Sequence, residues 1–304
     1  MKKRIMLFLP LVVVCLVLLR PICTNALVPL DPNAEASLTL HYQKDGETFS
    51  NLNISIYRIA EAFPNGTFQL IEPFASYPID IHYIKNQEQW NHIAQTLCSY
   101  IVADQVAPSL ESTTDSNGTV CFSDLKTGLY YVREVVAQQN GSKYVFNQFL
   151  VYVPTPQSNG TYQYDVEANP KCTKFKPYSH YTITKLWQDG GNQNIRPKEV
   201  TVDIYIDGIL YKTRVLNEEN NWTYRWYASD EDYEKWTVVE RDVPDIYKVM
   251  IQQSGSNFSI INTYQTTSDV PPTGDNSTPL LWILGMCFSG ILLLILGIYM
   301  RRRK

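Results

Sequence analysis

Short runs of alternating apolar and polar residues, separated by tight-turn signals, most constrain the fold of this chain. In Val200–Ile206 the apolar side chains occupy every second position, which predicts a strand with one buried face. Dipeptides that favour tight turns separate such runs: Asn65-Gly66, Asn117-Gly118, Asn140-Gly141, Asn159-Gly160 and Asp207-Gly208. This spacing predicts antiparallel β-sandwiches rather than alternating strands and helices.

The second half of the chain contains seven such runs in fewer than ninety residues. The predicted strands are Tyr181–Trp187, Glu199–Ile206, Ile209–Leu216, Trp222–Tyr227, Trp236–Glu240, Tyr247–Ile251 and Phe258–Tyr264. Seven short strands are typical of an immunoglobulin-like or transthyretin-like sandwich.

The first half repeats this pattern around one predicted helix. Its predicted strands are Leu38–Tyr42, Ile54–Ile59, Thr119–Phe122, Leu129–Val135, Val145–Val153 and Tyr162–Val166. Between them, residues 87–103 carry apolar side chains at three- and four-residue steps, which predicts an amphipathic helix packed on the sandwich. The residues of that apolar face are Trp90, Ile93, Ala94, Leu97 and Ile101.

We therefore predict an all-β fold with two sandwich domains, the first with the inserted helix. The expected domains are residues 34–172 and 180–265, joined by a linker at 173–179. A length of about 240 residues between the two ends of the chain suits two domains.

Both ends of the chain predict export. Lys2, Lys3 and Arg4 precede the apolar stretch Ile5–Leu19, and Ala26 ends a short segment suited to signal peptidase. We expect a signal peptide over residues 1–26.

At the other end, the uncharged run Leu280–Met300 is long enough to cross a bilayer as a transmembrane helix. The basic tail Arg301–Lys304 would stay on the cytoplasmic side.

The segment between these ends is strongly acidic. Eight basic residues and one acidic residue lie outside residues 27–274, so 18 Lys and Arg and 29 Asp and Glu remain, a net charge of −11. This charge argues against binding to nucleic acid or to anionic lipid.

The residue pattern gives no indication of an enzyme or of a cofactor. The histidines have no metal-ligand spacing, and neither a nucleophile motif nor a phosphate-binding glycine loop is present. Three of the six cysteines lie within residues 27–274, namely Cys98, Cys121 and Cys172, and they do not form a disulfide framework. We expect buried free thiols, with a Cys98–Cys121 pair as the alternative.

Three residues of the second domain form a chemically suggestive set. Lys185 lies in the first predicted strand on the same face as Ile183, and therefore points inward. Glu240 ends the fifth strand, and Asn262 lies in the last. Because the first and last strands of a Greek-key sandwich are often neighbours, we expect Lys185 and Asn262 to face each other.

Several short motifs in this half recur in the register of one known family. They are Thr182-Ile183-Thr184-Lys185-Leu186-Trp187, Arg196-Pro197, Asn221-Trp222-Thr223-Tyr224, Trp236-Thr237-Val238-Val239-Glu240, Val243-Pro244 and Ile261-Asn262-Thr263-Tyr264. Together they resemble the Cna B-type domain of Gram-positive adhesins and pilins. The resemblance implies a self-formed isopeptide bond from Lys185 to Asn262, assisted by Glu240 in a single turnover.

Elementary chemistry is compatible with that bond. A lysine titrates near ~10.4 in water, and attack requires the neutral amine. Burial among Trp187, Trp222 and Trp236 would lower the pKa of Lys185 and raise that of Glu240. Contact between amine and amide would supply an effective molarity on the order of 10⁵ M.

The motif ahead of the transmembrane segment resembles the sortase sorting signal Leu-Pro-x-Thr-Gly. It reads Val270-Pro271-Pro272-Thr273-Gly274, with Val in place of Leu. The resemblance implies cleavage between Thr273 and Gly274 and transfer of Thr273 to peptidoglycan or to another pilin subunit. We therefore expect a protein anchored in the wall of a Gram-positive bacterium, with sortase as a partner.

The first domain resembles the N-terminal domain of such proteins, but it lacks the same set of residues. Its Gly128–Glu134 segment is similar to the glutamate-containing hairpin, yet Leu40 stands where lysine would align and Asn169 is displaced. We expect no crosslink there, and Glu134 as a relic or a structural hydrogen-bonding residue. In Asn169-Pro170-Lys171, Lys171 is a candidate for the amine that pilus subunits join.

Two other classes of protein remain open. A eukaryotic type I membrane glycoprotein is favoured by many sequons: Asn53, Asn65, Asn117, Asn140, Asn159, Asn221, Asn257 and Asn276. The missing disulfides and the four-residue tail disfavour it. A thioester adhesin through Cys98 or Cys121 lacks a supporting motif. The sequence does not identify a host or matrix ligand.

Overall fold

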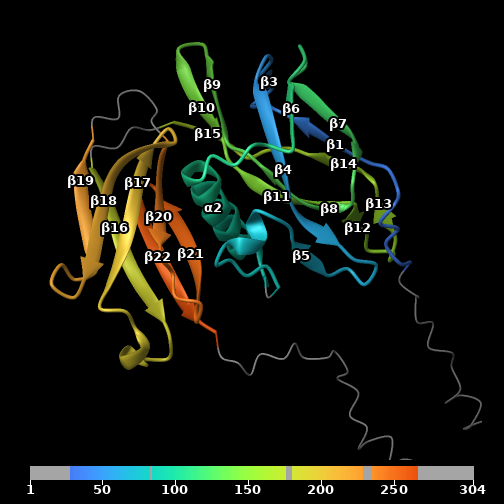
Figure 1. Cartoon of the computed structure of the whole chain (residues 1–304). Coiled ribbons are helices and arrows are strands. Elements are labelled where there is room, and N and C mark those ends of the chain that lie inside the picture. Colours follow the sequence, from blue (N-terminus) through green and yellow to red (C-terminus); the bar gives the residue numbers. More distant parts are fainter. Residues whose placement is uncertain (1–27, 83, 176–179, 229–234, 266–304) are drawn as a thin grey trace, which may run out of the picture. The chain divides into compact units, whose positions relative to one another are not determined.

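The computed structural model describes residues 28–82, 84–175, 180–228 and 235–265 (Figure 1). The predicted signal peptide, the Val270–Gly274 motif and the apolar run at 280–300 lie outside these residues. Within the described part of the chain, no helix is both long enough and apolar enough to cross a membrane. The described residues up to Thr263 form one compact unit.

The first half is built from short strands around one α-helix. Its elements are β1 (Ala36–His41), β2 (Gln43–Lys44), β3 (Glu47–Thr48), β4 (Asn53–Ala62), β5 (Phe68–Leu70), η1 (Phe74–Ser76), α2 (Gln87–Ala103), β6 (Leu110–Thr113), β7 (Thr119–Leu125), β8 (Gly128–Val132), β9 (Val135–Gln139), β10 (Ser142–Phe146), β11 (Phe149–Val153), β12 (Thr155–Pro156), β13 (Tyr162–Gln163), β14 (Asp165–Ala168) and β15 (Cys172–Lys174).

The two main sheets of the first half have the strand orders β14-β1-β7 and β11-β8-β4-β5, with β6 paired to β4. We call this pair of sheets the first sandwich. All five residues of β8 are buried, although alternation predicts one buried face. The reason is that the β4–β8 sheet packs on both sides: Tyr130 and Val132 join the core of the sandwich, whereas Leu129 and Tyr131 join the core that contains α2.

The second half forms a second sandwich of seven strands. These are β16 (His180–Gln188), β17 (Glu199–Ile206), β18 (Ile209–Asn217), β19 (Thr223–Tyr227), β20 (Trp236–Arg241), β21 (Tyr247–Ser254) and β22 (Asn257–Tyr264), with the short helix η2 (Gln193–Ile195) after β16. Their sheet orders are β19-β16-β22-β21 and β18-β17-β20. All seven predicted strands are present within a few residues of their expected bounds.

The first and last strands of each sandwich are neighbours, but they run parallel. β1 pairs with β14, and β16 pairs with β22. The remaining pairs are antiparallel, so the expected antiparallel architecture holds except at these terminal strands. A bond between β16 and β22 would therefore join the strands through which the chain enters and leaves the second sandwich.

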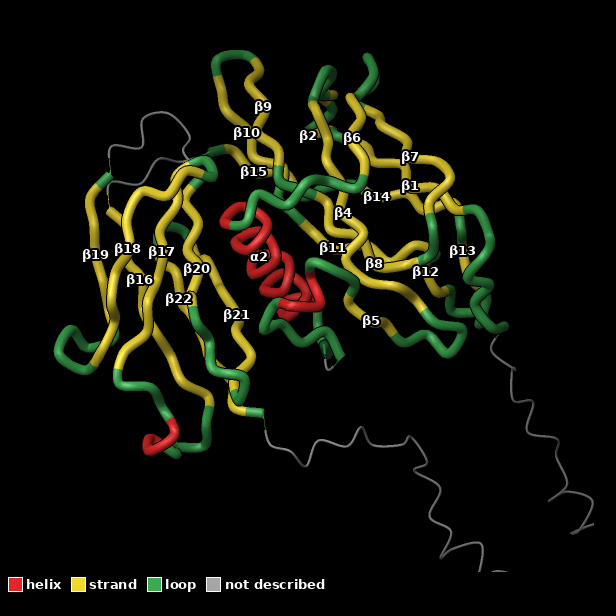
Figure 2. Tube along the Cα trace, in the orientation of Figure 1, coloured by secondary structure: helices red, strands yellow, loops and turns green. Residues whose placement is uncertain are grey.

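Helix α2 has the bounds predicted from the sequence. Asn86 begins it, because its side chain accepts a hydrogen bond from the backbone N–H of Gln89 at 2.9 Å. Ile93, Leu97 and Ile101 are buried, as their spacing predicts. Figure 2 shows α2 among strands, and its contacts reach β11 of the first sandwich and β20 and β21 of the second.

Three sequence-based expectations for the first half differ from the structure in detail. The expected strand Leu129–Val135 ends at Val132, and a new strand, β9, starts at Val135. The expected strand Val145–Val153 is divided into β10 and β11, which lie in different sheets. Part of the expected linker forms β15, which pairs with β10. Neither Arg133-Glu134 nor Asn147-Gln148 contains glycine or proline, so no turn signal marked where the chain changes sheets.

We predict that Leu97→Ala lowers the free energy of unfolding by about 2–5 kcal/mol, because Leu97 is fully buried and its removal leaves a cavity. The exposed Gln87→Ala variant at the start of the same helix is the control, and we expect a change within ~0.5 kcal/mol. Chemical denaturation of both variants measures the difference. Equal effects would contradict the packing of α2.

Candidate functional site

Strand β16 carries Lys185 into the interior of the second sandwich. Along this strand Tyr181, Ile183 and Lys185 are buried, which is the alternation expected from the sequence. The backbone N–H of Lys185 donates to the carbonyl of Trp222 at 2.8 Å, which fixes the strand at this point. The predicted inward orientation of Lys185 is thus what the structure shows.

Glu240 and Asn262 approach the same point from two other strands. Glu240 lies in β20 opposite Val202 of β17, and Asn262 lies in β22 opposite Trp187 of β16. Both side chains are buried, and Lys185 is only 2% exposed. Two sheets therefore bring an amine, a carboxyl group and a carboxamide together without access to water.

The geometry places Glu240 between its two partners. Its Oε1 accepts a hydrogen bond from Asn262 Nδ2 at 2.8 Å, and its Oε2 lies 3.7 Å from Lys185 Nζ. Lys185 Nζ also donates to the carbonyl of Leu186 at 2.9 Å. Glu240 Oε2 and Asn262 Oδ1 are buried without a hydrogen-bond partner. Such orphaned polar atoms are costly to bury.

Burial drives both ionisable groups toward their neutral forms. It lowers the pKa of Lys185 from 10.5 to about 8, although the Glu240 carboxylate opposes this shift. It raises the pKa of Glu240, opposed by Lys185 and by the hydrogen bond from Asn262. A neutral amine next to a protonated carboxyl group is the state required for attack on an amide.

The aromatic surroundings differ in one respect from the expectation. Lys185 Nζ lies 3.9 Å from the centre of the Trp187 ring, and Trp222 packs edge-on against Trp187. Trp236, however, packs with Tyr181 and Trp226 rather than with this group. It lies at the opposite end of β20 from Glu240, so the expectation that it surrounds Lys185 was wrong.

An ion pair that sequence reasoning missed lies beside the amine. The guanidinium of Arg196 binds both carboxylate oxygens of Asp189, and its centre lies 5.7 Å from the Trp187 ring. Arg196 further lowers the pKa of Lys185, whereas Asp189 raises it. The Arg196-Pro197 motif was noted in the sequence. Because Arg196 is distant from Lys185 along the chain, however, the sequence did not indicate that it lies beside this amine.

The first sandwich lacks the corresponding set, in agreement with the sequence. Leu40 occupies the equivalent place in the core, and Asn169 is exposed and accepts a hydrogen bond from Gln43. Glu134 instead pairs with Lys235 of the second sandwich, with 2.6 Å between carboxylate and amine. Glu134 is therefore a structural residue that joins the two halves.

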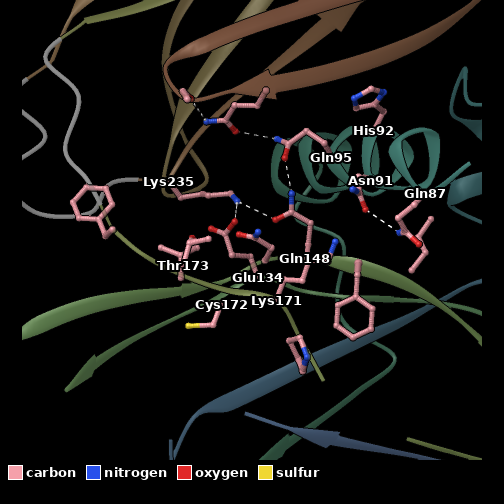
Figure 3. Close-up of a pocket in the computed structure, with 18 of the residues that line it drawn as sticks. Gln87, Asn91, His92, Gln95, Glu134, Gln148, Lys171, Cys172, Thr173 and Lys235 are labelled. Atoms are coloured by element: carbon pink, nitrogen blue, oxygen red, sulfur yellow. Dashed lines mark hydrogen bonds and ion pairs between the residues drawn. The ribbon is translucent and has the colours of Figure 1, made fainter. Parts of the chain in front are cut away.

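That ion pair begins a chain of polar contacts that lines a cavity of about 1070 Å³ (Figure 3). Lys235 Nζ also donates to Gln148 Oε1 at 3.4 Å, Gln148 donates to Gln95 of α2, and Gln95 donates to Gln253 of β21. The Glu134 carboxylate raises the pKa of Lys235 against the lowering effect of burial, so this amine stays charged, whereas the pKa of Lys185 is lowered to about 8.

The other predicted residues are dispersed. Lys171 is exposed and lines the same cavity, and its backbone carbonyl accepts a hydrogen bond from Asn147. The three cysteines are free, but only Cys98 is buried, so the expectation of buried thiols was wrong for the exposed Cys121 and for the half-buried Cys172. Among the described residues, no cluster of His, Cys, Asp and Glu is arranged to hold a metal ion.

The candidate site lies within a stretch of the chain that matches the model of a protein family. Residues 181–263 match the family model of the Cna protein B-type domain. The second sandwich is thus similar to a Cna B-type domain over nearly its whole length. Over 136 residues the chain is 33% identical to a collagen adhesin of Staphylococcus aureus, a match that covers 41% of this chain and 12% of the adhesin.

Two solved structures of bacterial proteins match this chain with low TM-scores. A single B repeat unit of the collagen-binding surface protein of Staphylococcus aureus is 18% identical, with 77% of this chain and 99% of that chain covered and a TM-score of 0.27. The full-length major pilin SpaD of Corynebacterium diphtheriae is 12% identical, with 79% and 100% covered and a TM-score of 0.28.

The lowered pKa of Lys185 predicts a pH dependence of stability in a variant that cannot react. In Asn262→Ala, the unfolded chain binds a proton between about pH 8 and 10.5 that the folded chain has already released. The free energy of unfolding should therefore rise with pH across this window, by up to roughly 3 kcal/mol.

Urea denaturation of Asn262→Ala at several pH values measures this rise. The Lys185→Met/Asn262→Ala double variant is the control, because it lacks the titrating amine and should lose the extra slope. Parallel curves for the two variants would contradict a buried, destabilised lysine.

Proposed function

We propose that this chain is a surface-exposed structural or adhesive protein whose Cna B-type domain is clamped by an isopeptide bond between Lys185 and Asn262. The observation that carries the proposal is the buried contact of amine, carboxyl group and carboxamide, with both ionisable groups shifted toward neutrality. The resemblance to a collagen adhesin supports the class of protein.

The proposed reaction is a single transamidation. The lone pair of Lys185 Nζ attacks Cγ of Asn262, a new N–C bond forms, and the Cγ–Nδ2 bond breaks. Glu240 takes one proton from the attacking amine and delivers a proton to Nδ2, which leaves as ammonia. Glu240 ends in its starting protonation state, and no oxidant or cofactor is consumed.

Glu240 is positioned to stabilise the intermediate as well. If the Asn262 carboxamide is rotated by half a turn, its oxygen and nitrogen exchange places. The oxygen then lies where Nδ2 is now, 2.8 Å from Glu240 Oε1. A protonated Glu240 then donates to that oxygen and polarises the carbonyl. This orientation also gives a partner to the oxygen that is otherwise orphaned.

The product would be a mechanical clamp. Tension on the ends of this domain pulls on β16 and β22, which are adjacent parallel strands. A covalent bond between them carries the load directly, so the hydrogen bonds of the sandwich are not sheared. This suits a stalk or a fibre on a cell surface.

Attachment to the wall is the second part of the proposal. Sortase would cleave between Thr273 and Gly274 and join Thr273 to peptidoglycan or to another subunit, while residues 280–300 hold the precursor in the membrane. The exposed Lys171 is the candidate acceptor amine if subunits polymerise. A monomeric adhesin requires no such amine.

We predict that the exported chain, residues 27–274, is lighter than its composition by one ammonia. Lys185→Ala and Glu240→Ala should each have the full composition mass, because one lacks the nucleophile and the other the proton shuttle. Intact mass spectrometry of the folded proteins tests this. A wild-type protein of full mass would refute the crosslink.

We also predict that Thr273→Ala abolishes covalent attachment to the wall. In a Gram-positive expression host with sortase, the wild-type protein should be released by a peptidoglycan hydrolase, whereas the variant should remain in the membrane fraction. Lys171→Ala is the second test: the loss of high-mass ladders would support a pilus subunit, and unchanged ladders would exclude Lys171 as the acceptor.

A further inference from the structure

The second sandwich has one open side, and the first sandwich covers it. Strand β20 is the last strand of one sheet, and β21 is the last strand of the other. Helix α2 packs against both strands. Lys185, Glu240 and Asn262 lie between these two sheets. Helix α2, which is outside the Cna B-type domain, therefore covers the edge strands on this side.

The closure satisfies backbone groups that an edge strand leaves open. The N–H of Ile251 donates to Thr96 Oγ1 of α2 at 2.8 Å, and the N–H of Val249 donates to the carbonyl of Pro78 at 2.7 Å. These two alternate residues of β21 face away from its partner β22. Unpaired backbone groups of an edge strand bind water or other strands. The two hydrogen bonds to the first sandwich therefore keep water away from this edge.

The closure extends to the end of β20 where Glu240 lies. Arg241, the next residue, forms an ion pair with Asp104 at the end of α2, with 3.1 Å between Nη1 and Oδ1. Tyr100, one turn earlier in α2, lines a cavity of about 550 Å³ together with Glu240 and Tyr247. Tyr100 therefore lies beside Glu240 at this edge, and Glu240 is only 1% exposed.

Tyr100 acts through bulk rather than through its hydroxyl group. Its ring stacks on Tyr77 with 4.6 Å between centres, and its side-chain oxygen is buried without a hydrogen-bond partner. Burial, and secondarily the charge of Glu240, raises the pKa of Tyr100, so the hydroxyl stays neutral. The aromatic ring of Tyr100 excludes water at this place and therefore favours the protonated form of Glu240.

We propose that the first sandwich completes the crosslinking site: α2 closes the β20–β21 edge, and Tyr100 is a positioning residue that keeps Glu240 dry during the reaction. This inference rests on the proposed Lys185–Asn262 crosslink. The Cna B-type domain in this chain would then depend on helix α2 of the first sandwich for a rapid crosslinking reaction.

The experiment follows the loss of ammonia with time in the exported chain. The protein is made by cell-free synthesis, samples are quenched in acid denaturant, and intact mass gives the crosslinked fraction. We compare wild type with Tyr100→Ala, which removes the aromatic ring beside Glu240, and with Tyr100→Phe, which keeps the ring and removes only the hydroxyl group. The matched control is Glu134→Gln, which weakens the contact between sandwiches at the other end of α2.

We expect Tyr100→Ala to slow crosslinking at least about tenfold, the effect of one pKa unit in the fraction of the reactive neutral pair. Tyr100→Phe and Glu134→Gln should react at the wild-type rate. If Tyr100→Ala yields no folded protein by circular dichroism, Tyr100→Leu replaces it, since Leu keeps an apolar contact but is too short to cover Glu240.

Three results would overturn the inference. A wild-type rate in a folded Tyr100→Ala or Tyr100→Leu variant would show that the aromatic ring is not needed. If Glu134→Gln slows crosslinking equally, the effect comes from weaker docking of the two sandwiches and not from Tyr100. If Tyr100→Phe is also slow, the effect comes from the hydroxyl group and not from the ring. If wild type itself never loses ammonia, the proposed crosslink fails instead.

Discussion

The burial of Lys185 beside Glu240 is the contact on which the account of this protein depends. An ammonium group in the core of a sandwich is expensive, and the structure lowers that cost by moving both groups toward neutrality. Glu240 also accepts a hydrogen bond from the amide of Asn262. In the proposed reaction, the costly burial of the amine favours a covalent bond between the first and last strands of the sandwich.

The two glutamates of the molecule show how a partner decides the role of a carboxyl group. Glu134 and Glu240 end similar sequence segments, Tyr-Tyr-Val-Arg-Glu and Trp-Thr-Val-Val-Glu. Glu240 meets a fully buried lysine whose pKa falls. Glu134 meets Lys235 at the boundary of the two sandwiches, where the pKa of the lysine rises and the ion pair stays charged. The first arrangement is the one that the proposed crosslink requires, and the second is a polar contact between the halves.

Alternation and helical spacing predicted the elements well, because they report which faces are buried. They placed α2 at its observed bounds and put Lys185 inward. They did not predict that β8 is buried on both faces, that Trp236 belongs to a different aromatic cluster, or that Arg196 lies beside Lys185. These features arise from contacts between segments far apart in the chain, which a periodic pattern does not encode. The Cna B-type motifs supplied the site residues that periodicity alone would have left as an ordinary lysine, glutamate and asparagine.

The most direct test of the central claim is peptide mapping of the exported protein by tandem mass spectrometry after proteolysis. The account predicts a branched peptide in which the side chain of Lys185 is joined to that of Asn262, with one ammonia lost at the junction. Recovery of Lys185 and Asn262 only in separate linear peptides, both unmodified, would contradict it.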